Sequence, residues 1–158
     1  MLRLTKLTDY AIVVMTHLAT DPERARSNAK DLAVEAHLPA PMVSKVLKTL
    51  TRRGLLVSQR GAAGGYVLAR PPAEISVADI IEALDGPLAL AQCCEVEPES
   101  CDHRPVCPVT GHWHRINTAI HEALSGIKLA DMARPLPQER LPVLRFHTGR
   151  SLHIVGKN

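Results

Sequence analysis

The chain has 158 residues, of which 46% are apolar, 22% are charged and 3% are aromatic, and its formal net charge is +3. These values are those of one compact soluble domain or of two small ones. No apolar stretch approaches the roughly 20 residues of a membrane-spanning helix, and the N-terminus has no apolar run before a small-residue cleavage site. The sequence therefore predicts a cytoplasmic protein with no membrane partner.

The first fifty residues predict three helices. Over residues 4–20, apolar side chains recur at intervals of three and four, which is typical of an amphipathic helix. A second helix is expected over residues 28–37, because Ser27 or Asn28 supplies an N-cap oxygen. A third is expected over residues 39–53, where two prolines fit the first turn. Its apolar residues are expected to face inward: Val43, Val46, Leu47 and Leu50.

A β-hairpin is expected after Gly54, which ends the third helix. Residues 55–58 and 66–69 are predicted strands, and the glycine-rich segment 60–65 is the turn between them. Two short helices joined by a tight turn and followed by a hairpin make a winged helix-turn-helix. The predicted fold class is thus mainly α with a small β-hairpin wing.

The positive charge is concentrated in this N-terminal part. Residues 1–70 hold eleven lysines and arginines against five acidic residues, a net charge of +6, while residues 71–158 hold eight against eleven, a net charge of −3. The second helix of a helix-turn-helix enters the major groove, and a glycine-rich wing lets the backbone and an arginine approach the duplex. We therefore expect double-stranded operator DNA as the partner, with contacts to bases or phosphates. The candidate contacts are Ser44, Lys45, Lys48, Thr49, Arg52, Arg60, Gly61 and Gly64.

Two further helices are expected in the C-terminal half. Ser76 can cap a short helix that ends at residue 84, and a long helix is expected over residues 110–125. One apolar stripe follows the long helix. Because the N-terminal module has little spare surface, we expect a helix of a second subunit to cover this stripe, and packing within the chain is the alternative. The stripe consists of Trp113, Ile116, Ile120, Ala123 and Leu124.

The predicted organisation therefore has three parts. Residues 1–72 form a DNA-binding domain, and residues 73–135 form a sensor loop with a dimerisation helix. Residues 136–158, rich in proline and basic residues, are expected to be a flexible tail.

All four cysteines of the chain fall within fifteen residues of the loop between the last two helices: Cys93, Cys94, Cys101 and Cys107. Thiolates at these spacings can converge on an iron–sulfur cluster. A zinc site and a reversible disulfide switch are the alternatives. The chain has no Cys-x-x-Cys pair near a βαβ pattern and no nucleotide-binding glycine loop, so we expect neither an enzyme nor a small-molecule substrate.

Several segments together resemble a known family. Residues 1–11, the wing at residues 58–70, the helix at residues 75–84 and the cysteine loop before a tryptophan-bearing helix are similar to the IscR/NsrR group of winged-helix regulators, the Rrf-two family. With Asp131-Met132 included, the set most resembles the branch that controls iron–sulfur cluster assembly of the SUF type. The resemblance covers residues 1 to about 135.

This resemblance implies a homodimeric transcriptional regulator, a repressor or a dual regulator, that senses cluster status, redox state or nitric oxide. It implies one 2Fe–2S or 4Fe–4S cluster per subunit, held by three cysteines. By position in the motif these are Cys93, Cys101 and Cys107. Cys94 is the additional cysteine, and the choice between Cys93 and Cys94 stays open.

The resemblance also bears on the fourth ligand. IscR-like members carry a histidine three residues after the third cysteine, where this chain has Thr110. Asp9 matches the position from which NsrR-like members supply a carboxylate across the dimer interface. The local imidazoles of His103, His112 and His114 are the other candidates.

Overall fold

The structure is a computed structural model, and it describes residues 4–20, 27–59, 61, 64–95 and 101–134. The predicted tail, residues 136–158, lies outside these residues. The elements in chain order are α1 (Lys6–Thr20), α2 (Ala29–Glu35), α3 (Ala40–Arg52), β1 (Leu56–Gln59), β2 (Gly65–Leu68), η1 (Pro72–Glu74), α4 (Val77–Asp85), η2 (Gln92–Cys94), η4 (Arg104–Val106), α5 (Thr110–Gly126) and α6 (Leu129–Met132). None of the helices in this described part is long and apolar enough to span a bilayer.

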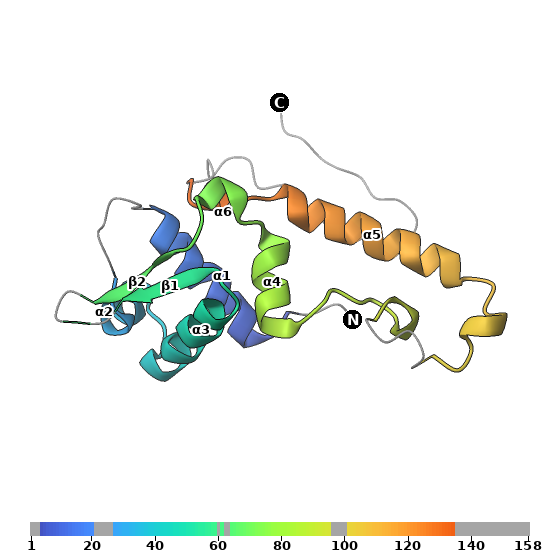
Figure 1. Ribbon diagram of the computed structural model, residues 1–158, viewed down its shortest axis with the longest axis horizontal. Helices are drawn as coiled ribbons and strands as arrows, with labels where there is room; N and C mark the ends of the chain where they lie inside the picture. Colours follow the sequence, from blue (N-terminus) through green and yellow to red (C-terminus); the bar gives the residue numbers. More distant parts are fainter. Residues whose placement is uncertain (1–3, 21–26, 60, 62–63, 96–100, 135–158) are drawn as a thin grey trace, which may run out of the picture.

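The first five elements form the predicted winged helix-turn-helix (Figure 1). Asn28 is the N-cap of α2, because its Oδ1 accepts hydrogen bonds from the backbone N–H groups of Lys30 at 3.0 Å and Asp31 at 2.9 Å. The antiparallel hairpin pairs Leu56 with Leu68. The mainly helical fold class with a two-stranded wing is confirmed.

The strands begin and end one residue away from the prediction. The Leu55 N–H donates to the Leu50 carbonyl at 3.0 Å, so Leu55 closes the end of α3 instead of starting β1. The helix end needs such donors, because its last carbonyls have no partner within the helix. β1 therefore starts at Leu56, and its partner strand covers Gly65–Leu68.

A single apolar core joins the winged helix to the elements that follow it. Buried residues of α1 and α3 pack together with Ile75, Ile80 and Leu129. After α5 the chain returns to this core: the Leu129 N–H donates to the Ile75 carbonyl at 2.8 Å, and the Val77 N–H donates to the Ile127 carbonyl at 3.0 Å. The C-terminal end of α5 is therefore attached directly to the winged-helix core.

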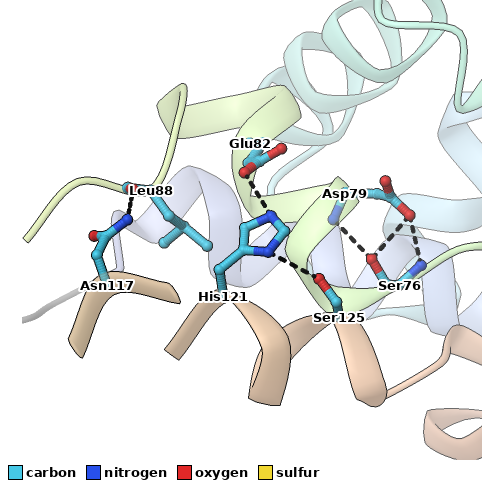
Figure 2. Close-up of polar contacts among 7 residues, drawn as sticks. All are labelled: Ser76, Asp79, Glu82, Leu88, Asn117, His121 and Ser125. Carbon is cyan, nitrogen blue, oxygen red and sulfur yellow. Dashed lines mark hydrogen bonds and ion pairs between the residues drawn. The ribbon is translucent and has the colours of Figure 1, made fainter. Parts of the chain in front are cut away.

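The start of α4 has a complete capping box (Figure 2). The Ser76 Oγ accepts from the Asp79 N–H at 3.1 Å, and the Asp79 carboxylate accepts from the Ser76 N–H at 2.8 Å. Burial acts to raise the pKa of Asp79, but the hydrogen bonds from Ser76 and the positive charges of Arg70 and Lys128 outweigh it and hold this pKa below the ordinary 3.8.

Replacing Asp79 with alanine should therefore lower the free energy of unfolding by about 1 kcal/mol at neutral pH. Because the folded-state pKa is the lower one, the carboxylate's contribution is complete above the unfolded value and is lost as the pH falls through the folded value. Urea unfolding at several pH values measures this, with Glu74→Ala, an exposed neighbour, as the control. A difference between Asp79→Ala and the wild type that persists at low pH would contradict the assignment.

Candidate functional site

Two opposite faces of α3 have different roles in the fold. Its apolar residues, predicted to face inward, are buried: Val43, Val46, Leu47 and Leu50. On the other face Lys45, Lys48 and Arg52 are exposed, and Ser44 and Thr49 are half-buried. The five candidate contacts on this helix thus share one solvent-facing surface, which has the hydroxyl and cationic groups that contact bases and phosphates.

The wing holds the other predicted DNA contacts. The Gly64 N–H donates to the Gly61 carbonyl at 2.9 Å, which closes the tip of the hairpin. Gly61 has a φ of +115°, a conformation that residues with a Cβ rarely adopt, and it is exposed. Arg60 lies outside the described residues. The described part of the tip therefore presents backbone without bulky side chains, beside Asn28 at the start of α2.

The cysteine-bearing segments lie at the other end of the molecule, around the N-terminal end of α5 (Figure 1). Cys93 and Cys94 belong to η2, which packs against α5, and Cys93 is only 5% exposed. Cys107 comes three residues before the first residue of α5, and both Cys107 and Cys101 are half-buried. The long helix α5 therefore carries the first and the last of the predicted ligand segments.

The thiols differ in their electrostatic surroundings. Hydrogen bonds from the Thr110 side chain, and then from the backbone of Val109 and Thr110 at the start of α5, lower the pKa of Cys107. Burial, and then a hydrogen bond with the Cys93 thiol, raises the pKa of Cys94. Cys107 is therefore the thiol whose anionic form, the form that binds metals, is favoured by the helix that follows it.

The structure brings Cys93 and Cys94 together, and all four cysteines are free thiols. Among the described residues, no three histidine, cysteine, aspartate or glutamate side chains lie close enough together to hold a metal ion. The donor set fits an iron–sulfur cluster, since cysteine thiolates are the ligands that hold such clusters. Convergence of Cys93, Cys101 and Cys107 on one cluster would be a change from this conformation.

Asp9 lies in the first turn of α1 and is exposed, beside a shallow depression lined by Leu4, Thr5 and Lys6. The start of α1 is fixed to the end of α4, because the Thr5 hydroxyl donates to the Asp85 carboxylate at 2.8 Å. Asp9 is therefore on the turn of α1 next to the point where the chain leaves α4 for the cysteines. The candidate imidazoles are all exposed: His103, His112 and His114.

The apolar stripe of α5 is only partly covered by its own chain. Not one of the seventeen residues of α5 is fully buried. Ile120 and Leu124 are half-buried and α5 contacts α4, whereas Trp113 and Ile116 are 38% and 45% exposed. Packing within the chain thus covers one part of the predicted stripe and leaves the other part to solvent.

Two polar residues of α5 that the sequence analysis did not single out attach this helix to the rest of the chain (Figure 2). The Asn117 side chain bonds the backbone of Leu88 and Leu90. The His121 Nε2 lies 3.3 Å from a carboxylate oxygen of Glu82 on α4. A signal was present, because asparagine is a poor helix former and yet lies in the middle of the apolar stripe.

Comparison with known proteins gives consistent matches. A family model, Rrf2, described as an iron-dependent transcriptional regulator, matches residues 4–135. The HTH-type transcriptional regulator NsrR of Halalkalibacterium halodurans is 30% identical over 131 residues, which are 83% of this chain and 90% of that protein.

Solved structures agree with this match. CymR, the global cysteine regulator of B. subtilis, has a TM-score of 0.67 and 31% identity, with 84% of this chain and 97% of that chain covered. IscR of T. potens has a TM-score of 0.63 and 30% identity, with 83% and 85% covered. The names of the NsrR and CymR relatives denote regulators.

Proposed function

Because the chain belongs to the Rrf2 family of iron-dependent transcriptional regulators, we propose that it is a homodimeric repressor whose cysteines hold an iron–sulfur cluster and whose operators control cluster assembly genes. The chain is a DNA-binding transcriptional regulator. One observation carries the finer proposal: cysteines lie at the N-terminal end of α5, an exposed apolar surface covers its first half, and its other end is attached to the DNA-binding core.

The proposed ligands are Cys93, Cys101 and Cys107, with Asp9 of the partner subunit as the fourth. In support, Asp9 is exposed and its carboxylate makes no hydrogen bond or ion pair within the described part of its own chain. A carboxylate is a harder ligand than a thiolate and is more easily displaced from iron. When bound, the cluster supplies a centre that responds to oxidants, nitric oxide or iron supply.

The proposed readout is the separation of the two α3 helices in the dimer, because a dimer reads half-sites at a fixed spacing. The cysteine segment leaves α4 beside the α1 end that Asp85 holds, and it then packs on α5. Its conformation is therefore linked both to the dimerisation helix and to the DNA-binding core. We infer that a change in this segment shifts the dimer between two geometries that differ in operator affinity.

The test is to purify the protein without oxygen and measure iron, sulfide and zinc, together with the visible absorbance. Binding to promoter DNA of the iron–sulfur assembly genes is then compared before and after the cluster is removed. We expect iron and acid-labile sulfide, and a change in operator affinity on removal. Zinc without sulfide, or equal operator binding by both forms, would overturn the proposal.

A thiol-based regulator is the second candidate, favoured by the adjacent Cys93 and Cys94 thiols and by the similarity to a cysteine regulator. A zinc-based sensor has the same cysteines available. In a thiol-based regulator, metal-free protein would bind the operator fully, and mild oxidation alone would change its affinity. The metal analysis above separates these candidates from the cluster.

For the DNA surface, we expect Lys45→Ala and Lys48→Ala each to weaken operator binding by about 1 to 3 kcal/mol if the side chain reaches a base. If the lysine contacts only phosphate, its replacement would instead weaken binding to the operator and to random duplex equally. It would also reduce the slope of log binding constant against log salt concentration by about 1. Fluorescence anisotropy on both duplexes at several salt concentrations measures this. Arg134→Ala is the control, because it removes the same charge from an exposed position after the end of α6. No loss of affinity in either lysine variant would exclude this face of α3.

A further inference from the structure

The segment between α4 and η2 is held on α5 by one side chain. The Asn117 Nδ2 donates to the Leu88 carbonyl at 2.9 Å, and the Asn117 Oδ1 accepts from the Leu90 N–H at 3.0 Å. Figure 2 shows the Asn117 side chain directed from α5 to the carbonyl of Leu88. Within the described residues, these two are the hydrogen bonds that join residues 86–92 to α5.

The chemistry of this contact requires an amide. A carboxamide both donates and accepts, so it can bond a carbonyl and an N–H two residues apart in the same strand of backbone. An aspartate in this place would keep the acceptor but would set a negative charge against the Leu88 carbonyl, and an alanine would keep neither bond. Since asparagine is a weak helix former, its place inside α5 is explained by this contact and not by helix formation.

The contact also fixes a distance that matters for the cysteines. Asn117 lies seven residues after Thr110, so it is about 10 Å along α5 from the end where Cys107 lies. Cys93 follows Leu90 by three residues, which span at most about 10 Å when extended. With Leu90 bound to Asn117, the chain is just long enough for Cys93 to lie at the Cys107 end of the helix, and it cannot reach beyond that end.

We propose that Asn117 is a positioning residue for the cysteine site, which sets where the Cys93 segment lies on α5. This inference rests on the proposed function in one respect, since the site that Asn117 would position is the proposed cluster site. The packing of η2 on α5 and the 5% exposure of Cys93 agree with this role of Asn117.

The first test uses metal-free protein and therefore does not depend on a cluster. The rate at which iodoacetamide modifies each cysteine is followed by mass spectrometry in the wild type, Asn117→Ala, Asn117→Asp and Thr118→Ala. Thr118 is the matched control, because it is the next residue of α5 and is exposed. We expect the modification of Cys93 to accelerate about tenfold in both Asn117 variants and not in Thr118→Ala, while Cys101 is unaffected.

The rate of backbone hydrogen exchange in residues 86–95 should rise in the two Asn117 variants. Far-UV circular dichroism of these variants should show that α5 is retained. In cluster-loaded protein, the two Asn117 variants should lose their visible absorbance about tenfold faster in the presence of a chelator. If Cys93 stays as protected in Asn117→Ala as in the wild type, the inference is overturned. If the wild type holds no iron and sulfide, the proposed function fails, and the modification rates still decide whether Asn117 positions Cys93.

Discussion

Replacing Cys107 with serine should leave a protein that folds and binds DNA but holds roughly a tenth or less of the wild-type iron and sulfide. A serine hydroxyl remains protonated at neutral pH, whereas the start of α5 favours the thiolate of Cys107. We expect Cys93→Ser and Cys101→Ser to lose the cluster to the same extent. Iron and sulfide analysis with visible absorbance, on protein prepared without oxygen, measures this effect.

Cys94→Ser is the matched control, because Cys94 adjoins Cys93 on η2 and is also a free thiol. It should retain iron, sulfide and absorbance close to the wild-type values. The opposite result, with the cluster kept in Cys93→Ser and lost in Cys94→Ser, would move the first ligand to Cys94. Retention of the cluster in all four variants would show that the cysteines do not hold it.

Replacing Ile116 with glutamate should convert the dimer to a monomer and weaken operator binding at least about a hundredfold. Ile116 is 45% exposed and Trp113 is 38% exposed. We expect a helix of the partner subunit to cover this apolar surface of α5. A carboxylate placed there would be desolvated without a counter-charge in the dimer. A monomer then reads one half-site instead of two, which removes the gain from simultaneous binding.

Light scattering coupled to size-exclusion chromatography gives the oligomeric state, and gel-shift titration gives the operator affinity. Thr118→Glu is the control, because it introduces the same charge at an exposed residue of α5 about 200° around the helix from Ile116. It should remain dimeric and bind the operator normally. A dimeric Ile116→Glu variant would show that α5 is not the dimerisation surface.

The winged helix could be predicted from the sequence because its signals are local. Apolar spacing identified α1 and α3, and the polar residues Asn28 and Ser76 marked two helix starts. β1 starts one residue later than predicted because Leu55 uses its N–H to close α3, and the composition of a sequence does not show such competition for donors.

The sequence identifies candidate residues for the cysteine site but does not give their arrangement. Cysteine spacing identifies candidate ligands, whereas the attachment of η2 to α5 depends on Asn117 and on two backbone groups of residues 88 and 90. Every residue has a backbone carbonyl, and nearly every residue has a backbone N–H, so the sequence does not show which of these groups a side chain will bond. Periodicity likewise could not say that Ile120 and Leu124 would be half-buried while Trp113 and Ile116 stayed exposed, because all four residues belong to one apolar stripe of the same helix.

The return of the chain from α5 to the core makes the long helix a lever with a fixed pivot. The backbone bonds between residues 75–77 and 127–129 hold its C-terminal end, and its seventeen residues extend about 25 Å to the cysteine end. A displacement of about 1 Å at the cysteine end then tilts the helix by about 2° about that pivot. The pivot adjoins α4 and the core that carries α3, so in the proposed mechanism movement of the thiols would reach the DNA-binding surface as a rotation.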